Sequence, residues 1–257
     1  MSETDGARLT AIASGKGGVG KTWFAVTLAH AWAREGRRVL LFDGDLGLAN
    51  IDIQLGLAPA PGLGAVLAGR MAMADAVQHV AGLPFGVLTG QSGSGALAGL
   101  KPRTVAGIGN GLRALDFDDI VLDLGAGLDH ANRHLAAVAD RLLVVVTDEP
   151  TSLTDAYAVI KLHTADTEGA EVQIVVNQAA SAAAGQRTYA TLARACGHFL
   201  RRTPVLAGLI RRDDHVRDAI RRQTPLLTRH PGCHAAQDVE RLAAGLGAAA
   251  ACNLSSP

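Results

Sequence analysis

Short apolar runs, rich in β-branched residues, alternate with longer stretches of helical character along the whole chain. Each run has the length of a strand that is buried on both faces. Seven runs are predicted to be strands: Leu9–Ala13, Arg38–Phe42, Phe85–Gly90, Asp119–Gly127, Arg141–Thr147, Val172–Gln178 and Pro204–Ile210. Strands separated by helices predict βαβ units, and therefore an α/β fold with a mostly parallel, twisted sheet that carries helices on both faces.

The sequence contains no feature that marks a domain boundary. It has no linker, repeat or charge run, and its 257 residues fit one large α/β domain. We therefore predict a single domain over residues 1–257, with a short N-terminal tail (1–8) and a C-terminal tail from about 247 to 257. The Gly/Ser-rich stretch Gly90–Leu100 is predicted to be a mobile loop beside a strand end.

Composition narrows the classes of protein. Hydrophobic residues make up 48% of the chain and aromatic residues only 4%, which is typical of helices packed closely on a parallel sheet. The formal net charge is +0, so no global field draws the chain to nucleic acid or lipid. The N-terminus is too polar for a signal peptide, and no run of about 18 apolar residues is present, so we expect a cytoplasmic protein.

Cysteine and histidine usage points to no metal centre. The three cysteines, Cys196, Cys233 and Cys252, are odd in number and form no CxxC pair, which argues against a disulfide framework or a four-cysteine metal site. The nine histidines are scattered and show no metal-ligand spacing. We therefore expect reduced thiols.

The stretch SGKGGVGKTW carries the strongest chemical signal. The phosphate-loop pattern G-x-x-x-x-G-K-[ST] is matched by eight consecutive residues: Gly15, Lys16, Gly17, Gly18, Val19, Gly20, Lys21 and Thr22. A strand precedes them, and a helix is predicted from about Lys21 to Glu35, ending at Gly36. Glycines let the backbone direct its N–H groups at phosphate oxygens, and the helix N-terminus adds its positive dipole end. Lys21 is predicted to reach the β- and γ-phosphates, and the Thr22 hydroxyl to hold Mg²⁺.

Three carboxylates follow predicted strands at the same edge of the sheet. Asp123 ends the run IVLD, the position of a Walker B aspartate. Asp43 and Asp45 follow the run VLLF, and two acids so close together suit Mg²⁺ binding and the positioning of water. The alternatives are a strand-end cap for Asp123 and a turn-forming DGD for the other two.

The loop GKGGVGKT resembles the deviant Walker A motif of the MinD/ParA ATPases, and the resemblance covers nearly the whole chain. In that family the extra lysine, here Lys16, crosses a dimer interface and contacts the phosphates of the nucleotide held by the other subunit. The resemblance therefore implies a P-loop NTPase fold, ATP with Mg²⁺, and an ATP-dependent homodimer. A second cation at a triphosphate neutralises charge that grows in the transition state. The alternative for Lys16 is an ordinary solvated loop lysine.

The resemblance also implies further roles by position. Asp45 matches the acid that positions the attacking water, and Asp43 matches the acid that supports Mg²⁺ or its waters. Asn177 matches the asparagine that reads the adenine edge, with a strand-end turn residue as the alternative. The predicted catalytic residues are thus Lys16, Lys21 and Asp45, and the predicted metal ligands are Thr22, Asp43 and Asp123.

Three stretches resemble one branch of this family, the FlhG (FleN) regulators of flagellar number: Asp43–Leu57, Thr147–Leu162 and Arg211–Leu246. The resemblance implies partners in flagellar placement, namely FlhF, a flagellar transcription regulator or switch-complex proteins. Members of the branch often begin with a DQAxxLR segment that stimulates FlhF. Only MSETDGAR precedes the first predicted strand here, so the sequence gives no basis for stimulation by that segment.

Two segments of the sequence bear on whether the protein binds DNA or a membrane. Ten arginines lie between Arg187 and Arg229. We interpret them as a solvated helical face with the i, i+4 pairs Asp213–Arg217 and Asp218–Arg222, in preference to a DNA-binding patch. A DNA-partition or cargo-positioning ATPase, and a module that holds ATP but barely hydrolyses it, remain the alternative functions. The C-terminal stretch DVERLAAGLGAAAACNLSSP has one arginine and no lysine, so we expect at most weak, peripheral contact with the inner face of the cell membrane.

Overall fold

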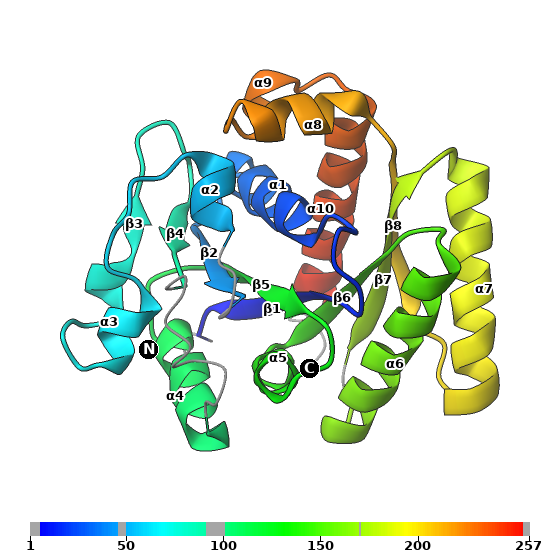
Figure 1. The fold of residues 1–257 in the computed structure, drawn as a ribbon, viewed down its shortest axis with the longest axis horizontal. Helices are drawn as coiled ribbons and strands as arrows, with labels where there is room; N and C mark the ends of the chain where they lie inside the picture. Colours follow the sequence, from blue (N-terminus) through cyan, green and yellow to red (C-terminus); the bar gives the residue numbers. More distant parts are fainter. Residues whose placement is uncertain (1–5, 46–49, 91–100, 170, 254–257) are drawn as a thin grey trace.

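The computed structural model describes residues 6–45, 50–90, 101–169 and 171–253, in which helices and strands alternate as predicted (Figure 1). The strands are β1 Arg8–Ser14, β2 Val39–Gly44, β3 Gln78–His79, β4 Gly86–Leu88, β5 Asp119–Ala126, β6 Arg141–Val146, β7 Val172–Ala179 and β8 Val205–Arg211. The helices are α1 Lys21–Arg34, α2 Ile51–Leu55, α3 Leu63–Leu67, the 3₁₀ turn η1 Ala74–Ala76, α4 Pro102–Arg113, α5 His130–Ala137, α6 Pro150–Asp166, α7 Ala182–Leu200, α8 Asp214–Arg221, α9 Leu226–Arg229 and α10 His234–Asn253. All seven predicted strands are present, and each lies within two residues of its predicted bounds.

The eight strands form one sheet in the order β3-β4-β2-β5-β1-β6-β7-β8. Within the described residues every pair is parallel except β3 with β4. The two-residue strand β3 has no apolar run of its own, which is why the sequence pattern did not predict it. The predicted class, a mostly parallel α/β sheet of the P-loop NTPase type, is confirmed.

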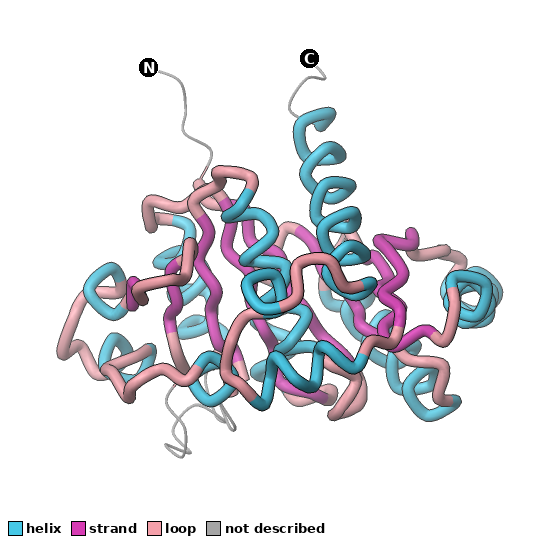
Figure 2. The backbone as a smooth tube through the Cα atoms, turned by 90° about the horizontal axis from the view of Figure 1, so that it is seen from above, coloured by secondary structure: helices cyan, strands magenta, loops and turns pink. Residues whose placement is uncertain are grey.

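Successive side chains along the central strands point to opposite faces of the sheet, so the hydrophobic core has one part on each face. In β6, Leu142 and Val144 pack on one face, whereas Leu143 and Val145 pack on the other. Helices α4, α5, α6 and α7 cover the first face, and α1 and α10 cover the second (Figures 1 and 2). A strand buried on both faces must be apolar at successive positions, which explains why these runs read as continuous hydrophobic segments.

The C-terminal helix extends into the stretch predicted as the C-terminal tail. A tail is expected from about residue 247, but α10 continues to Asn253 in spite of Gly245 and Gly247. Its inner side is buried on α1, and Trp32 Nε1 donates a hydrogen bond to the Ala243 carbonyl (3.1 Å). Tertiary packing of this kind outweighs the cost of about 1 kcal/mol for each helical glycine. No helix among the described residues is long and apolar enough to cross a membrane.

The ion pairs predicted within the arginine-rich segment do not form. Asp213 caps α8 by accepting from the His215 backbone N–H (3.0 Å), because an N-cap carboxylate turns toward the free N–H groups of the first turn. Asp218 contacts Arg229 (2.5 Å) and His230 (2.7 Å) at the end of α9. The turn between α8 and α9 brings Arg229 and His230 to Asp218, which contacts them in place of the arginine one helical turn away. The predicted loop Gly90–Leu100 lies largely outside the described residues.

Candidate nucleotide site

The phosphate loop joins the carboxyl end of β1 to the first turn of α1. Gly18 and Gly20 have φ angles of 80° and 92°, a left-handed conformation that favours glycine. Gly20 is also the N-cap of α1, and the 14-residue helix points its free N–H groups into the loop. The loop therefore has the backbone geometry and the helix dipole that bind phosphate.

Two glycines are required by close contacts as well as by backbone angle. A Cβ atom at Gly15 would clash with Asp155 in the first turns of α6. A Cβ atom at Gly20 would lie 2.5 Å from Asn177 Nδ2. The phosphate loop is therefore packed tightly between α6 and the end of β7.

Lys21 lies in a largely buried position, where it interacts electrostatically with two carboxylates. Only 9% of the residue is exposed, and burial lowers the pKa of its ammonium group, while the charges of Asp123 and Asp45 act in the opposite direction. A Cβ atom at Gly125 would lie 3.3 Å from Asp45 Cγ, so the Asp45 carboxyl group lies against the carboxyl end of β5. The structure thus brings together the predicted phosphate lysine and the acid predicted to position water.

Asp123 is the residue best suited to a cation. It is 2% exposed, and its Oδ1 atom has no hydrogen-bond partner within the described part of the chain. Burial raises the pKa of its carboxyl group to about 7, against the opposing effects of a Thr22 hydrogen bond and the Lys21 charge. A buried carboxylate oxygen without a partner is costly unless a cation binds it. Thr22 and Asp123 therefore fit Mg²⁺, although their role as ligands stays a prediction.

The Asp43 carboxylate accepts hydrogen bonds from three backbone N–H groups that follow it in the chain. Its Oδ1 accepts from the Asp45 N–H (3.2 Å), and its Oδ2 accepts from the N–H groups of Asn50 (3.1 Å) and Ile51 (3.2 Å). Asp43 also lies directly opposite Asp123 in the register of β2 and β5. Burial and then the Asp123 charge raise the pKa of Asp43 to about 7. Its visible role is to hold the chain before α2, and support of Mg²⁺ stays a prediction.

The extra lysine contacts its own subunit. Lys16 Nζ forms an ion pair with Glu149 and donates a hydrogen bond to Thr151 Oγ1 (3.1 Å) at the start of α6. The Lys16 and Glu149 side chains are 39% and 59% exposed, so the pair lies at the surface, where a partner subunit could reach it. The contact of Lys16 across a dimer interface stays a prediction.

Asn177 supports the phosphate loop. Its Nδ2 donates to the Val19 carbonyl (2.7 Å), and the residue is 4% exposed. It also lines a cavity of about 300 Å³ beside the loop, together with Gly18, Gly20, Trp23, Gln178, Arg211, Arg212, Asp213, Asp214, Val216, Arg217 and Ile220. This cavity has room for part of a nucleotide next to the phosphate loop, and adenine recognition by Asn177 stays a prediction.

Sequence reasoning missed two parts of the site. The first is the start of α6, where Glu149 and Thr151 bind Lys16 and Asp155 packs against Gly15. The second is the segment after β8 that walls the cavity. Both follow parallel strands, and since loops at the carboxyl edge of such a sheet line its ligand site, this rule could have identified them.

Fold and loop together define a P-loop nucleotide-binding protein, and comparison with known proteins identifies the family. Residues 10–226 match the CobQ/CobB/MinD/ParA nucleotide binding domain, so the chain belongs to this family. It is 36% identical over 226 residues to the antiactivator FleN of Pseudomonas aeruginosa, covering 87% of this chain and 80% of that protein. It is 32% identical over 193 residues to the flagellum site-determining protein YlxH of Helicobacter pylori, covering 72% and 63% of the two chains.

A solved structure gives the same assignment. The septum site-determining protein MinD of Pyrococcus horikoshii OT3, complexed with Mg-ADP, superposes with a TM-score of 0.80 at 25% identity, covering 95% of this chain and 97% of the other. The predicted resemblance to MinD/ParA ATPases and the predicted ligands, ATP and Mg²⁺, are confirmed at the level of the family. The chain is a MinD/ParA-type ATPase.

Proposed function

We propose that this ATPase is an ATP-dependent dimerising switch that regulates the number or placement of flagella. The observation that carries the proposal is Lys16, a second lysine in the phosphate loop, which is held at the surface by Glu149. The similarity to FleN and YlxH supports the flagellar role.

The chemistry follows from the positions of the side chains. Lys21 and the N–H groups of the loop would bind the β- and γ-phosphates, and Asp45 would orient the attacking water. Thr22 and Asp123 would hold Mg²⁺, which supplies positive charge to the phosphates. Lys16 of the second subunit would stabilise the charge that develops as the γ-phosphate leaves.

Dimerisation would require Lys16 to change partners. In the single chain its ammonium group is held by Glu149, and an exposed ion pair of this kind contributes only about 0–1 kcal/mol. A triphosphate offers several negative oxygens and a stronger, charge-assisted hydrogen bond. ATP in a partner subunit would therefore draw Lys16 away from Glu149, and hydrolysis would allow it to return.

The two states would present different surfaces to other proteins. ATP favours the dimer and hydrolysis releases it, so partners that bind one state shift the population. The partner classes that fit this role are FlhF, a flagellar transcription regulator and proteins of the flagellar switch complex. Pull-down from cells with the Asp45→Ala chain, held in its ATP form, would identify the partner.

The test compares two variants that should behave in opposite ways on a sizing column with saturating ATP and Mg²⁺. Lys16→Ala should bind nucleotide but stay monomeric, because it lacks the group that crosses the interface. Asp45→Ala should accumulate as dimer and lose about 10²–10³ in hydrolysis rate, because water is no longer oriented. Lys161→Ala, at an exposed lysine of α6, is the matched control and should behave as the unaltered chain.

Three outcomes would contradict the proposal. Normal dimerisation and turnover in Lys16→Ala would make that residue an ordinary surface lysine. Monomeric behaviour of both variants under saturating ATP would remove the switch. ATP-dependent, salt-sensitive binding of the unaltered chain to nonspecific DNA would favour the DNA-partition alternative.

A further inference from the structure

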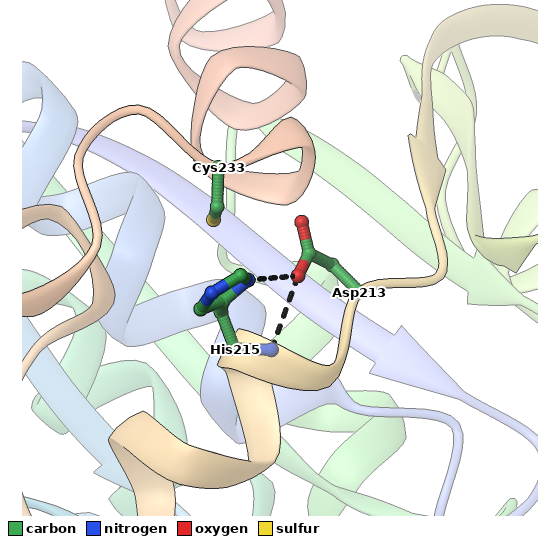
Figure 3. A group of neighbouring side chains, drawn as sticks. All are labelled: Asp213, His215 and Cys233. Carbon is green, nitrogen blue, oxygen red and sulfur yellow. Dashed lines mark hydrogen bonds and ion pairs between the residues drawn. The ribbon is translucent and has the colours of Figure 1, made fainter.

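Three potential metal ligands from two separate segments meet beside the nucleotide cavity. Asp213 and His215 lie at the start of α8, and Cys233 directly precedes α10. One potential ligand atom from each residue lies within 4.8 Å of the other two. Figure 3 shows the Cys233 thiol, the His215 ring and the Asp213 carboxylate directed toward one another.

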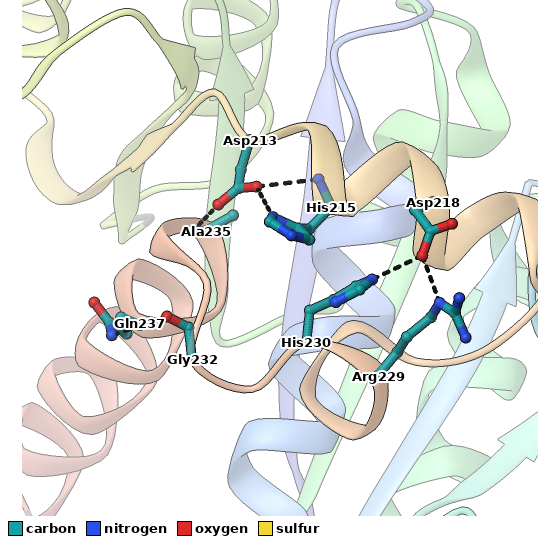
Figure 4. Close-up of polar contacts among 8 residues, drawn as sticks. All are labelled: Asp213, His215, Asp218, Arg229, His230, Gly232, Ala235 and Gln237. Atoms are coloured by element: carbon teal, nitrogen blue, oxygen red, sulfur yellow. Dashed lines mark hydrogen bonds and ion pairs between the residues drawn. The ribbon is translucent and has the colours of Figure 1, made fainter.

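Asp213 already joins the two segments. Its Oδ1 accepts from the His215 backbone N–H (3.0 Å) and contacts His215 Nδ1 (2.8 Å), and its Oδ2 accepts from the Ala235 N–H (3.3 Å) (Figure 4). The Asp213 side chain is 8% exposed and the His215 side chain is 55% exposed. The cluster is therefore anchored on the protein side and open to solvent on the other.

Neighbouring side chains orient the histidine. The ring centroids of His230 and His215 are 4.4 Å apart, and His230 Nε2 contacts Asp218 Oδ2 (2.7 Å). Asp218 in turn contacts Arg229 Nε (2.5 Å), as Figure 4 shows. A chain of supporting contacts that fixes the orientation of a ligand is usual around metal sites in proteins.

The ligand types identify the cation. Thiolate sulfur, imidazole nitrogen and carboxylate oxygen are the donors that bind Zn²⁺, whereas Mg²⁺ prefers oxygen ligands alone. Two anionic ligands would balance the charge of a divalent cation. We propose that Asp213, His215 and Cys233 form a Zn²⁺ site, with a fourth position open to water, that ties the start of α8 to the start of α10.

Zn²⁺ bound at this site would stabilise part of the nucleotide cavity. Asp213 lines that cavity together with Gly18, Gly20 and Asn177 of the nucleotide site. A cation bound to Asp213 would hold one wall of the cavity in place.

The test uses the untagged full chain, freed of metal with a chelator and kept nucleotide-free in excess Mg²⁺ so that oxygen-only sites are filled. Zn²⁺ is titrated in competition with a chromophoric chelator, and Co²⁺ serves as the spectroscopic probe. We expect one tight Zn²⁺ per chain and a thiolate-to-Co²⁺ charge-transfer band. Cys233→Ser and His215→Gln should each weaken Zn²⁺ binding about 100-fold or more, whereas Cys252→Ser and His198→Gln should not.

A second measurement needs no substitution and so does not depend on how the variants fold. Alkylation of each cysteine in the unaltered chain is followed by peptide mass spectrometry with and without Zn²⁺. Zn²⁺ should protect Cys233 at least tenfold, with Cys252 as the internal reference. Equal alkylation of Cys233 in both conditions, or a Co²⁺ complex without the thiolate band, would overturn the proposal.

Discussion

Asp123→Asn should stabilise the nucleotide-free protein, and the gain should depend on pH. Asp43 and Asp123 lie opposite each other on adjacent strands, both almost fully buried, and the pKa of each carboxyl group is raised to about 7. An unfolded chain ionises these groups near their ordinary value of 3.8. Stability is therefore lost once the pH rises above the unfolded value, because the unfolded chain ionises these groups while the folded chain keeps them protonated.

The magnitude follows from linkage. Between pH 4 and pH 7 the folded chain holds a proton on Asp123 that the unfolded chain has released, so stability falls by about 1.4 kcal/mol per pH unit for this group. Asparagine has the same shape and does not titrate. The stability advantage of Asp123→Asn should therefore grow by about 2–3 kcal/mol from pH 5 to pH 8.

Urea unfolding in the presence of a metal chelator measures this effect, with the fluorescence of the buried Trp23 and Trp32 as the signal. Asp75→Asn, at an exposed carboxylate, is the control and should give no pH-dependent gain. Mg²⁺ with ADP should reverse the order, because it stabilises the unaltered chain and not Asp123→Asn. An advantage for Asp123→Asn that stayed constant or shrank as the pH rose would refute the reasoning.

Four further results are expected. Lys21→Ala should abolish Mg²⁺-dependent ATP binding in a nucleotide-binding assay, and the unaltered chain should prefer ATP to GTP; equal affinities would contradict the role given to Asn177. Gly20→Ala should lower the free energy of unfolding by about 1–3 kcal/mol, since it combines a positive φ with a clash at Asn177. Glu149→Gln should change stability by less than about 1 kcal/mol but raise the ATP-dependent dimer fraction on a sizing column, because Lys16 is released; a lower fraction would argue against the exchange of partners. Sedimentation with anionic liposomes should stay weak even with ATP, and strong ATP-dependent binding would show that α10 is a better lipid anchor than its few cations suggest.

The sequence by itself determined seven of the eight described strands and the phosphate loop. Apolar runs located the strands to within two residues because a strand buried on both faces must be apolar along its length. The phosphate loop could be predicted because its eight residues are contiguous, and its function depends on local backbone angles and on the start of one helix. Asp123 lies within the apolar run that predicted β5, so the sequence could place it in the sheet, and its role as a metal ligand stays a prediction.

Only the tertiary structure decided which distant residues meet. The strand order puts β2 beside β5, which sets Asp43 opposite Asp123, and burial and then the Asp123 charge raise the pKa of Asp43. The start of α6 supplies Glu149 as the partner of Lys16. The histidines and cysteines show no metal-ligand spacing along the chain, yet folding brings His215 and Cys233 together. Such contacts depend on strand order and helix packing, which a pattern of neighbouring residues does not encode.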